Sequence, residues 1–261
     1  MRKSLNLLAA AALAVAGSVS AQPVQTGFLD RTIEVHGAQY RYQVYVPAAY
    51  TNTTQQWPVI LYLHGVGERG TDGLRQTLIG LPAAVRVAAA RYPAIVVMPQ
   101  APPDSNWVGA AGDAAMAALD RTLAEYRTDP ARVYLTGLSM GGNGAWNLAY
   151  RFPERFAALA VLCGFVSQAS PAVPGSKPAV PGGGEAAFPL LAERLKSLPI
   201  WISHGEIDAT VPVEESRRAA AALRAVGANV RFVEYAGVGH NVWEPTFASP
   251  EFSGWLFSQR R

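Results

Sequence analysis

The strongest constraint on the fold is a regular alternation of continuous apolar runs with alanine-rich segments of helical spacing. A run that is apolar at every position is typical of a parallel strand buried on both faces. Residues 58–63, 94–98 and 157–162 are of this kind, and residues 132–136, 199–203 and 230–235 have the same character but include polar residues. The segments of helical spacing are residues 74–90, 113–126, 142–150, 187–195, 213–226 and 247–257. The alternation predicts a three-layer α/β/α fold around a mostly parallel, doubly wound sheet.

A different pattern precedes these runs. Within residues 32–46, apolar and polar residues alternate on both sides of His36-Gly37, which is typical of an antiparallel hairpin at a sheet edge. Half of the 261 residues are hydrophobic and 16% are charged, so the chain can bury a large core. We expect a single α/β domain over residues 22–261.

Residues 1–21 have the pattern of a signal peptide. Arg2 and Lys3 precede an apolar run over residues 5–16, and small residues then lead to Ala21, after which we expect cleavage. The run is shorter than the ~20 apolar residues that cross a membrane. The pattern therefore predicts a secreted or periplasmic protein with no stable membrane anchor, and an uncleaved N-terminal anchor is the alternative.

Charge and composition narrow the possible functions. A net charge of +3 without a basic cluster does not favour nucleic-acid binding. The single cysteine, Cys163, can neither pair within the chain nor anchor a cysteine-rich metal site. No two of the four histidines have the i, i+4 spacing of a helical zinc motif. We therefore expect no metal and no cofactor.

One stretch interrupts the alternation. Residues 167–184 carry four prolines and three consecutive glycines, so they form neither a helix nor an interior strand. A long insertion in a compact domain is either a flexible surface loop or a cover beside a functional site. The sequence leaves both interpretations open.

The first indication of chemistry is Ser139. It stands in Gly137-Leu138-Ser139-Met140-Gly141, a G-x-S-x-G motif directly after an apolar strand and directly before a helix. The two glycines leave room for a sharp turn that exposes a serine hydroxyl at its apex. This strand–turn–helix context predicts that Ser139 is a nucleophile.

A serine nucleophile needs a base, and the base needs an acid that orients it. In the chain order serine, acid, histidine, the base lies downstream of Ser139, which leaves His204 and His240. We favour His240, because it lies in a glycine-bracketed loop after the last strand, where an imidazole can reach over the sheet edge. Asp208 is favoured as the acid because it leads into a turn, and Glu206 is the alternative.

Attack on a carbonyl carbon builds negative charge on the carbonyl oxygen, which preorganised N–H groups stabilise. The Met140 N–H, at the start of the helix after the serine, is one expected donor. The Val66 N–H, in the glycine-rich Leu63-His64-Gly65-Val66-Gly67 loop, is the other. For the His64 side chain we expect a role in bracing this loop.

Two tryptophans are candidates for the substrate site. Trp107 follows a proline-rich stretch, and Trp243 stands three residues after His240. Both could form apolar walls around a substrate, and a core position is the alternative for each.

Together these residues resemble the α/β-hydrolase superfamily over nearly all of residues 22–261. Residues 64–70 (HGVGERG), 137–142 (GLSMGG), 204–208 and 239–243 resemble small serine carboxylesterases. The similar groups are the phospholipase/carboxylesterase type and the dienelactone-hydrolase-like or "predicted peptidase" branch, near feruloyl esterases and polyhydroxybutyrate depolymerase-like proteins. The resemblance implies a Ser139–His240–Asp208 triad with an oxyanion hole from Val66 and Met140. Dienelactone hydrolase itself is less similar, because its nucleophile is a cysteine.

The sequence therefore predicts a secreted serine carboxylesterase acting on short-chain or aromatic esters of the feruloyl or acetyl type. The substrate is expected to be a small molecule or an ester attached to a polymer. Two alternatives are a serine peptidase-like hydrolase and a non-catalytic hydrolase-fold binding protein. The sequence does not indicate the oligomeric state.

Overall fold

The computed structural model describes residues 24–167, 173 and 175–261. The signal-peptide pattern of residues 1–21 and part of the insertion at residues 167–184 therefore lie outside the described residues. The strands are β1 (Gly27–Val35), β2 (Ala38–Val46), β3 (Trp57–Leu63), β4 (Ile95–Pro99), β5 (Thr128–Leu138), β6 (Ala158–Leu162), β7 (Ile200–Gly205) and β8 (Val230–Tyr235).

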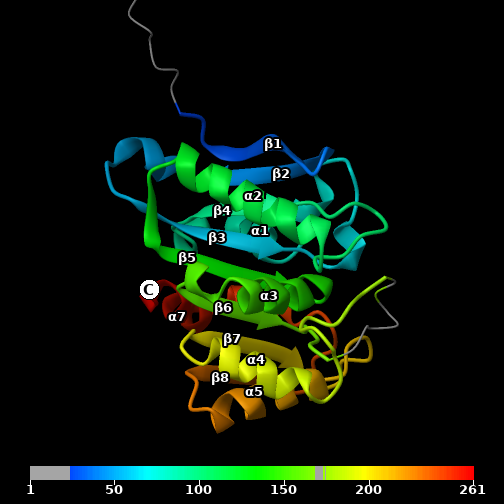
Figure 1. The fold of residues 1–261 in the computed structure, drawn as a ribbon. Coiled ribbons are helices and arrows are strands. Elements are labelled where there is room, and N and C mark those ends of the chain that lie inside the picture. Colours follow the sequence, from blue (N-terminus) through cyan, green and yellow to red (C-terminus); the bar gives the residue numbers. More distant parts are fainter. Residues whose placement is uncertain (1–23, 168–172, 174) are drawn as a thin grey trace, which may run out of the picture.

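These strands form one eight-stranded sheet in the order β1-β2-β4-β3-β5-β6-β7-β8. Strands β3 to β8 pair in parallel, and β2 joins them through an antiparallel pairing with β4. The β1–β2 hairpin is antiparallel and lies at the edge (Figure 1). The predicted mostly parallel sheet with an N-terminal antiparallel hairpin is confirmed.

Helices cover both faces of the sheet. On the interior strand β3, Val59 and Leu61 belong to one core while Ile60 and Tyr62 belong to the other, as the period of two in a strand requires. The near face in Figure 1 carries α2 (Ala110–Glu125), α3 (Met140–Arg151), α4 (Ala187–Leu195) and α5 (Glu214–Ala225). The opposite core contains residues from α1 (Leu81–Val87), α6 (Trp243–Ala248) and α7 (Pro250–Ser258). The doubly wound, three-layer architecture is thereby confirmed.

One predicted helix is shorter than the pattern of residues 74–90 suggested. The backbone of Gly80 has φ 67° and ψ −137°, which no α-helical residue adopts. The chain before it forms only a short 3₁₀ turn at Arg75–Thr77. The helix begins after Gly80 with Pro82 in its first turn, where a proline is tolerated. Apolar spacing alone did not reveal this break.

The predicted final helix at residues 247–257 is two helices instead of one. The hydroxyl of Ser249 accepts a hydrogen bond from the Phe252 N–H and caps α7, whose first residue is Pro250. Because a proline ring clashes with the preceding turn, α6 ends before it. On the face that it shares with α1, α6 packs against that helix.

Candidate active site

Ser139 lies at the apex of a sharp turn between β5 and α3. Its backbone has φ 54° and ψ −119°, a region that L-residues rarely occupy. A Cβ at Gly137 would lie 2.1 Å from the Gly141 carbonyl oxygen, and a Cβ at Gly141 would lie 2.0 Å from the Leu63 carbonyl oxygen. Both positions therefore require glycine, because the turn presses α3 against the ends of β3 and β5.

Ser139, His240 and Asp208 form one chain of hydrogen bonds. His240 Nε2 lies 2.9 Å from Ser139 Oγ, and His240 Nδ1 lies 2.7 Å from Asp208 Oδ2. The three residues come from the turn after β5, the loop after β8 and the loop after β7, all at the carboxyl edge of the sheet. The structure thus brings together the three residues that the sequence singled out.

The Asp208 carboxylate is held by N–H donors on both oxygens. Oδ1 accepts from the Thr210 and Val211 N–H groups at 2.8 and 2.9 Å, and Oδ2 faces His240 and, at 3.2 Å, His204 Nε2. Burial would raise the pKa of this carboxyl, but the bonds from His204, His240 and the two backbone groups hold the pKa well below its usual range. Asp208 is therefore ionised wherever the protein is folded at moderate pH.

The two alternative residues make hydrogen bonds of a different kind. Glu206 is exposed, and its Oε2 accepts a hydrogen bond from the Gly237 N–H at 2.9 Å. His204 is fully buried, with Nδ1 2.7 Å from Ser216 Oγ and Nε2 2.9 Å from the Val211 carbonyl oxygen. The geometry therefore favours His240 and Asp208 over both.

Two backbone N–H groups lie beside Ser139. Val66 begins a 3₁₀ turn at Val66–Glu68, and Met140 begins α3. The N–H of the first residue of a helix has no acceptor within that helix, so both groups can bind an anion. A Cβ at Gly65 would lie 3.7 Å from the Cβ of Ser139, which shows how closely the Val66 loop approaches the serine.

The His64 side chain stabilises this loop through hydrogen bonds on both ring nitrogens. Its side chain is fully buried; Nδ1 donates to the Gly65 carbonyl oxygen at 2.6 Å, and Nε2 accepts from the Ala101 N–H at 3.0 Å. Trp107 is also fully buried, donates Nε1–H to the His64 carbonyl oxygen at 3.0 Å, and packs edge-on against the His64 ring. This corrects the expectation that Trp107 forms a wall of the substrate site, because its indole has no surface open to a substrate.

We expect acid to destabilise the protein through His64. Burial lowers the pKa of His64 from 6.5 to about 4. Between these values the unfolded chain binds a proton that the folded chain does not, so stability is full above pH 6.5 and falls as the pH drops toward 4. The loss from this one group is about 2 kcal/mol at pH 5.

The measurement is the free energy of unfolding in urea at pH 7.5 and pH 5. In His64→Asn, which keeps an N–H for the Gly65 carbonyl but does not titrate, the difference between the two pH values should shrink by about 2 kcal/mol. The control is His36→Asn, since the His36 side chain is 71% exposed. An undiminished pH difference in His64→Asn would contradict this origin of the acid sensitivity.

The described part of the insertion is packed onto α3. The Asn147 side chain donates to the Ala179 carbonyl oxygen at 2.8 Å, and the Gly184 N–H donates to the Ser167 carbonyl oxygen at 2.7 Å, which closes the base of the insertion. The Glu215 carboxylate also accepts from the Ser167 N–H and hydroxyl at 3.0 and 2.6 Å. Residues 175–184 are thus anchored beside the helix that begins at the Ser139 turn.

Trp243 is placed differently from Trp107. It is the first residue of α6 and is only partly buried. Its ring stands perpendicular to the His240 imidazole, with ring centroids 5.6 Å apart. It also lines an apolar groove between α1 and α6. Trp243 can therefore contact both the base and a bound molecule.

One group of described side chains has metal-ligating atoms close together. Cys163, Asp208 and His240 each offer one such atom within 4.8 Å of the others. Asp208 and His240 are hydrogen-bonded to each other, and burial raises the pKa of the Cys163 thiol well above its ordinary value. Because metals bind the thiolate, this group is better explained as an acid–base pair beside a neutral buried thiol.

The bond from His204 to Asp208 was missed by sequence reasoning, which considered His204 only as a competing base. The available signal was spacing, since the two residues stand four apart where the chain leaves β7. That spacing indicates proximity. It does not indicate that the imidazole turns toward the carboxylate.

Comparison with known proteins shows similarity to esterases. A family model described as "Putative esterase" matches residues 33–250. Carboxylesterase SOBER1 of Arabidopsis thaliana is 31% identical over 126 residues, which is 48% of this chain and 48% of that protein. The chain thus aligns with about half the length of this curated relative.

Solved structures extend the similarity to the whole fold. The crystal structure of a thermostable esterase is 33% identical with a TM-score of 0.72, covering 90% of this chain and 63% of that one. A ferulic acid esterase is 20% identical with a TM-score of 0.65, covering 89% of this chain and 97% of that one, and shows the fold alone. Because the family model covers most of the chain, the protein belongs to this esterase family.

Proposed function

We propose that the protein is a serine carboxylic-ester hydrolase, with Ser139 as nucleophile, His240 as general base and Asp208 as the residue that orients His240. The observation that carries the proposal is the continuous hydrogen-bond chain from Ser139 Oγ through His240 to Asp208. It starts at a serine held in a rarely occupied backbone conformation. Membership of the esterase family supports the same reaction class.

The proposed reaction has two halves. Ser139 Oγ attacks the ester carbonyl carbon while its proton passes to His240 Nε2, and the Val66 and Met140 N–H groups stabilise the resulting oxyanion. His240 then gives the proton to the alcohol oxygen, so the carbon–oxygen bond breaks and the acyl group stays on Ser139. A water molecule, deprotonated by His240, then attacks the acyl carbon; the bond to Ser139 Oγ breaks, Ser139 takes the proton back from His240, and the acid is released. Asp208 keeps the proton of His240 on Nδ1 and stabilises the imidazolium.

The proposed substrates are short-chain or aromatic esters of the feruloyl or acetyl type, free or attached to a polymer. The exposure of the base supports access for such esters. The His240 side chain is 22% exposed, so the site is open to solvent. No cofactor is needed for the steps above.

The proposal for the cellular location rests on the sequence alone. The pattern of residues 1–21 supports export, with a single domain over residues 22–261 as the mature protein. Within the described ranges, no helix is both long and apolar enough to span a membrane.

The test is hydrolysis of p-nitrophenyl acetate, with p-nitroacetanilide as the matched amide. We expect turnover of the ester and little or none of the amide, because an amine is a far poorer leaving group than a phenol. Turnover of the amide at a comparable rate would favour a peptidase-like hydrolase. No turnover of either, or of methyl ferulate, acetylated xylan and polyester oligomers, would favour a non-catalytic protein.

A further inference from the structure

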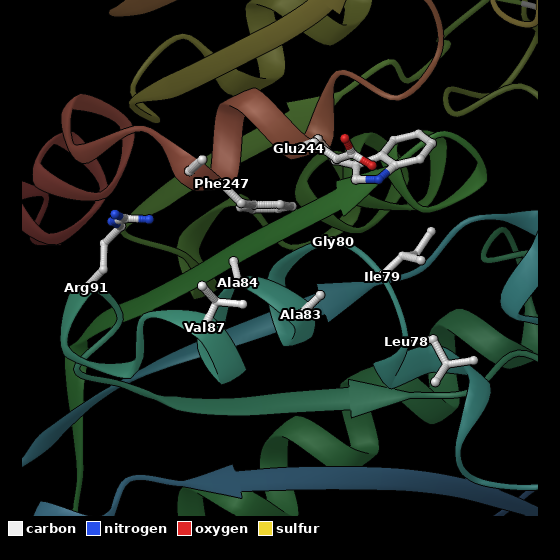
Figure 2. Close-up of a pocket in the computed structure, with 11 residues that line it drawn as sticks. Leu78, Ile79, Gly80, Ala83, Ala84, Val87, Arg91, Glu244 and Phe247 are labelled. Atoms are coloured by element: carbon white, nitrogen blue, oxygen red, sulfur yellow. The ribbon is translucent and has the colours of Figure 1, made fainter.

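An apolar groove of about 330 Å³ lies between α1 and α6. Figure 2 shows Ala83 and Ala84 of α1 facing Phe247 of α6 across it, with Ile79 near one end and Val87 near the other. We call this the α1–α6 groove. Its size falls at the lower end of the range for small-molecule sites.

The groove exposes apolar side chains that would be more stable out of water. Val87 is 89% exposed and Leu78 is 65% exposed, and both line it. The charged lining residues, Arg91 and Glu244, lie toward opposite ends, so the walls between them are uncharged (Figure 2). An uncharged apolar group is therefore the ligand that this surface would favour.

One end of the groove lies beside the Ser139 site. Trp243 lines the groove and also stands against the His240 ring. At the same end, a Cβ at Gly80 would lie 2.8 Å from a methyl carbon of Leu138, the residue directly before Ser139. To reach the groove, a molecule bound at the serine would extend past Trp243.

The chemistry decides which half of an ester lies there. The carbonyl oxygen must point to the Val66 and Met140 N–H groups, whereas the alcohol oxygen must come within hydrogen-bond distance of His240 Nε2 to receive its proton. Since the groove opens at Trp243, beside His240, it lies on the side of the departing alcohol.

We propose that the α1–α6 groove binds the apolar alcohol half of the ester substrate. This inference rests on the proposed function. Binding in the groove would make the protein selective for the chain length of the alcohol and not for that of the acid.

The test compares two ester series with the wild-type protein. Among methyl to hexyl acetates, kcat/KM should rise about twofold or more with each methylene group, because each one leaves water. Among methyl esters of acids of increasing length, no comparable rise is expected. A rise with the acid chain instead of the alcohol chain would overturn the proposal.

Variants locate the effect. Ala83→Phe fills the groove and should lower the ratio of kcat/KM for hexyl over methyl acetate at least tenfold. Val87→Asp, at an exposed position where folding is not at risk, should lower the same ratio by placing a charge on the wall. Ala221→Phe is the control, since Ala221 is exposed on α5. An unchanged ratio in folded Ala83→Phe and in Val87→Asp would overturn the proposal.

This failure is distinguishable from failure of the proposed function. If acetates are hydrolysed in a Ser139-dependent way without selectivity for the alcohol, only the groove assignment is lost. If no acetate is hydrolysed, the esterase itself is wrong.

A second, independent observation concerns His204. Its Nε2 faces two acceptors, the Val211 carbonyl oxygen at 2.9 Å and Asp208 Oδ2 at 3.2 Å. Nε2 must therefore carry the proton, which leaves Nδ1 to accept from the Ser216 hydroxyl at 2.7 Å. The same Oδ2 receives His240, so the two histidines share one carboxylate oxygen.

We infer that His204 is a positioning residue for the reaction: its Nε2–H fixes the Asp208 oxygen that orients His240. Loss of His204 should lower kcat, because a small misplacement of the Asp208–His240 pair slows the proton transfers that the pair carries out. KM should stay unchanged, because His204 is placed behind Asp208 and does not contact the substrate.

The test compares two replacements. His204→Met removes the donor and should lower kcat about tenfold or more with KM within twofold, whereas His204→Gln keeps an N–H near the position of Nε2 and should recover most of the loss. If His204→Met does not fold, Ser216→Ala, which removes the hydrogen bond that holds the His204 ring in place, should lower kcat severalfold. The inference would be overturned by a wild-type kcat in folded His204→Met or in Ser216→Ala. It would also be overturned if folded His204→Gln had a kcat no higher than that of His204→Met.

Discussion

Ser139→Ala should lower kcat on p-nitrophenyl acetate by about 10⁴-fold or more and leave the fold unchanged. The substitution removes the only atom that forms the acyl-enzyme. The oxyanion donors and binding contacts remain, so a small rate above the uncatalysed one should persist. Initial rates over a range of substrate concentrations give kcat, and urea unfolding shows whether stability is kept.

The matched control is Ser258→Ala, at an exposed serine near the end of α7. It should retain the wild-type rate. The same two variants, treated with a fluorophosphonate and analysed by mass spectrometry, should differ in labelling, with no adduct on Ser139→Ala. Wild-type activity in Ser139→Ala would remove the nucleophile assignment and with it the proposed reaction.

Asp208→Asn should lower kcat by about 10⁴-fold with little change in KM. An asparagine retains the size of the side chain, but it carries no charge to stabilise the imidazolium and can hold His240 in the wrong tautomer. It also leaves the donors of His204, Thr210 and Val211 facing a neutral group. The loss should therefore appear in kcat, together with a measurable fall in unfolding free energy.

Glu206→Gln is the control for Asp208→Asn, because it makes the same chemical change two residues away. Glu206 contacts the Gly237 N–H and is exposed, so the variant should keep kcat within about threefold of wild type. Equal losses in the two variants would move the orienting role away from Asp208.

The local parts of the structure could be predicted from the sequence. The turn at Ser139 needs glycine at fixed offsets after a buried strand, and both the strand and the glycines are visible in the sequence. The sheet followed from runs that are wholly or mainly apolar, which are typical of strands buried on both faces. The chain order serine, acid, histidine then left two candidates for the base and two for the acid.

The parts that depend on side-chain direction could not be predicted. Trp107 and Trp243 were both candidates for the substrate site, yet one is enclosed under the Val66 loop and the other stands at the groove. Asn147 on α3 binds the insertion at Ala179, a contact between residues 32 positions apart that no periodicity reveals. The break at Gly80 was hidden because the apolar spacing continues across it.

The site draws on strands of unequal stability. Ser139 and Val66 follow central strands, whereas His240 follows β8, the last strand of the sheet, whose residues are only partly buried. Outer strands open by local fluctuations at a lower free-energy cost than central ones. The base can therefore detach while the nucleophile and the oxyanion donors remain in place. At low denaturant concentration, activity would therefore fall with local opening at β8, before the central strands unfold.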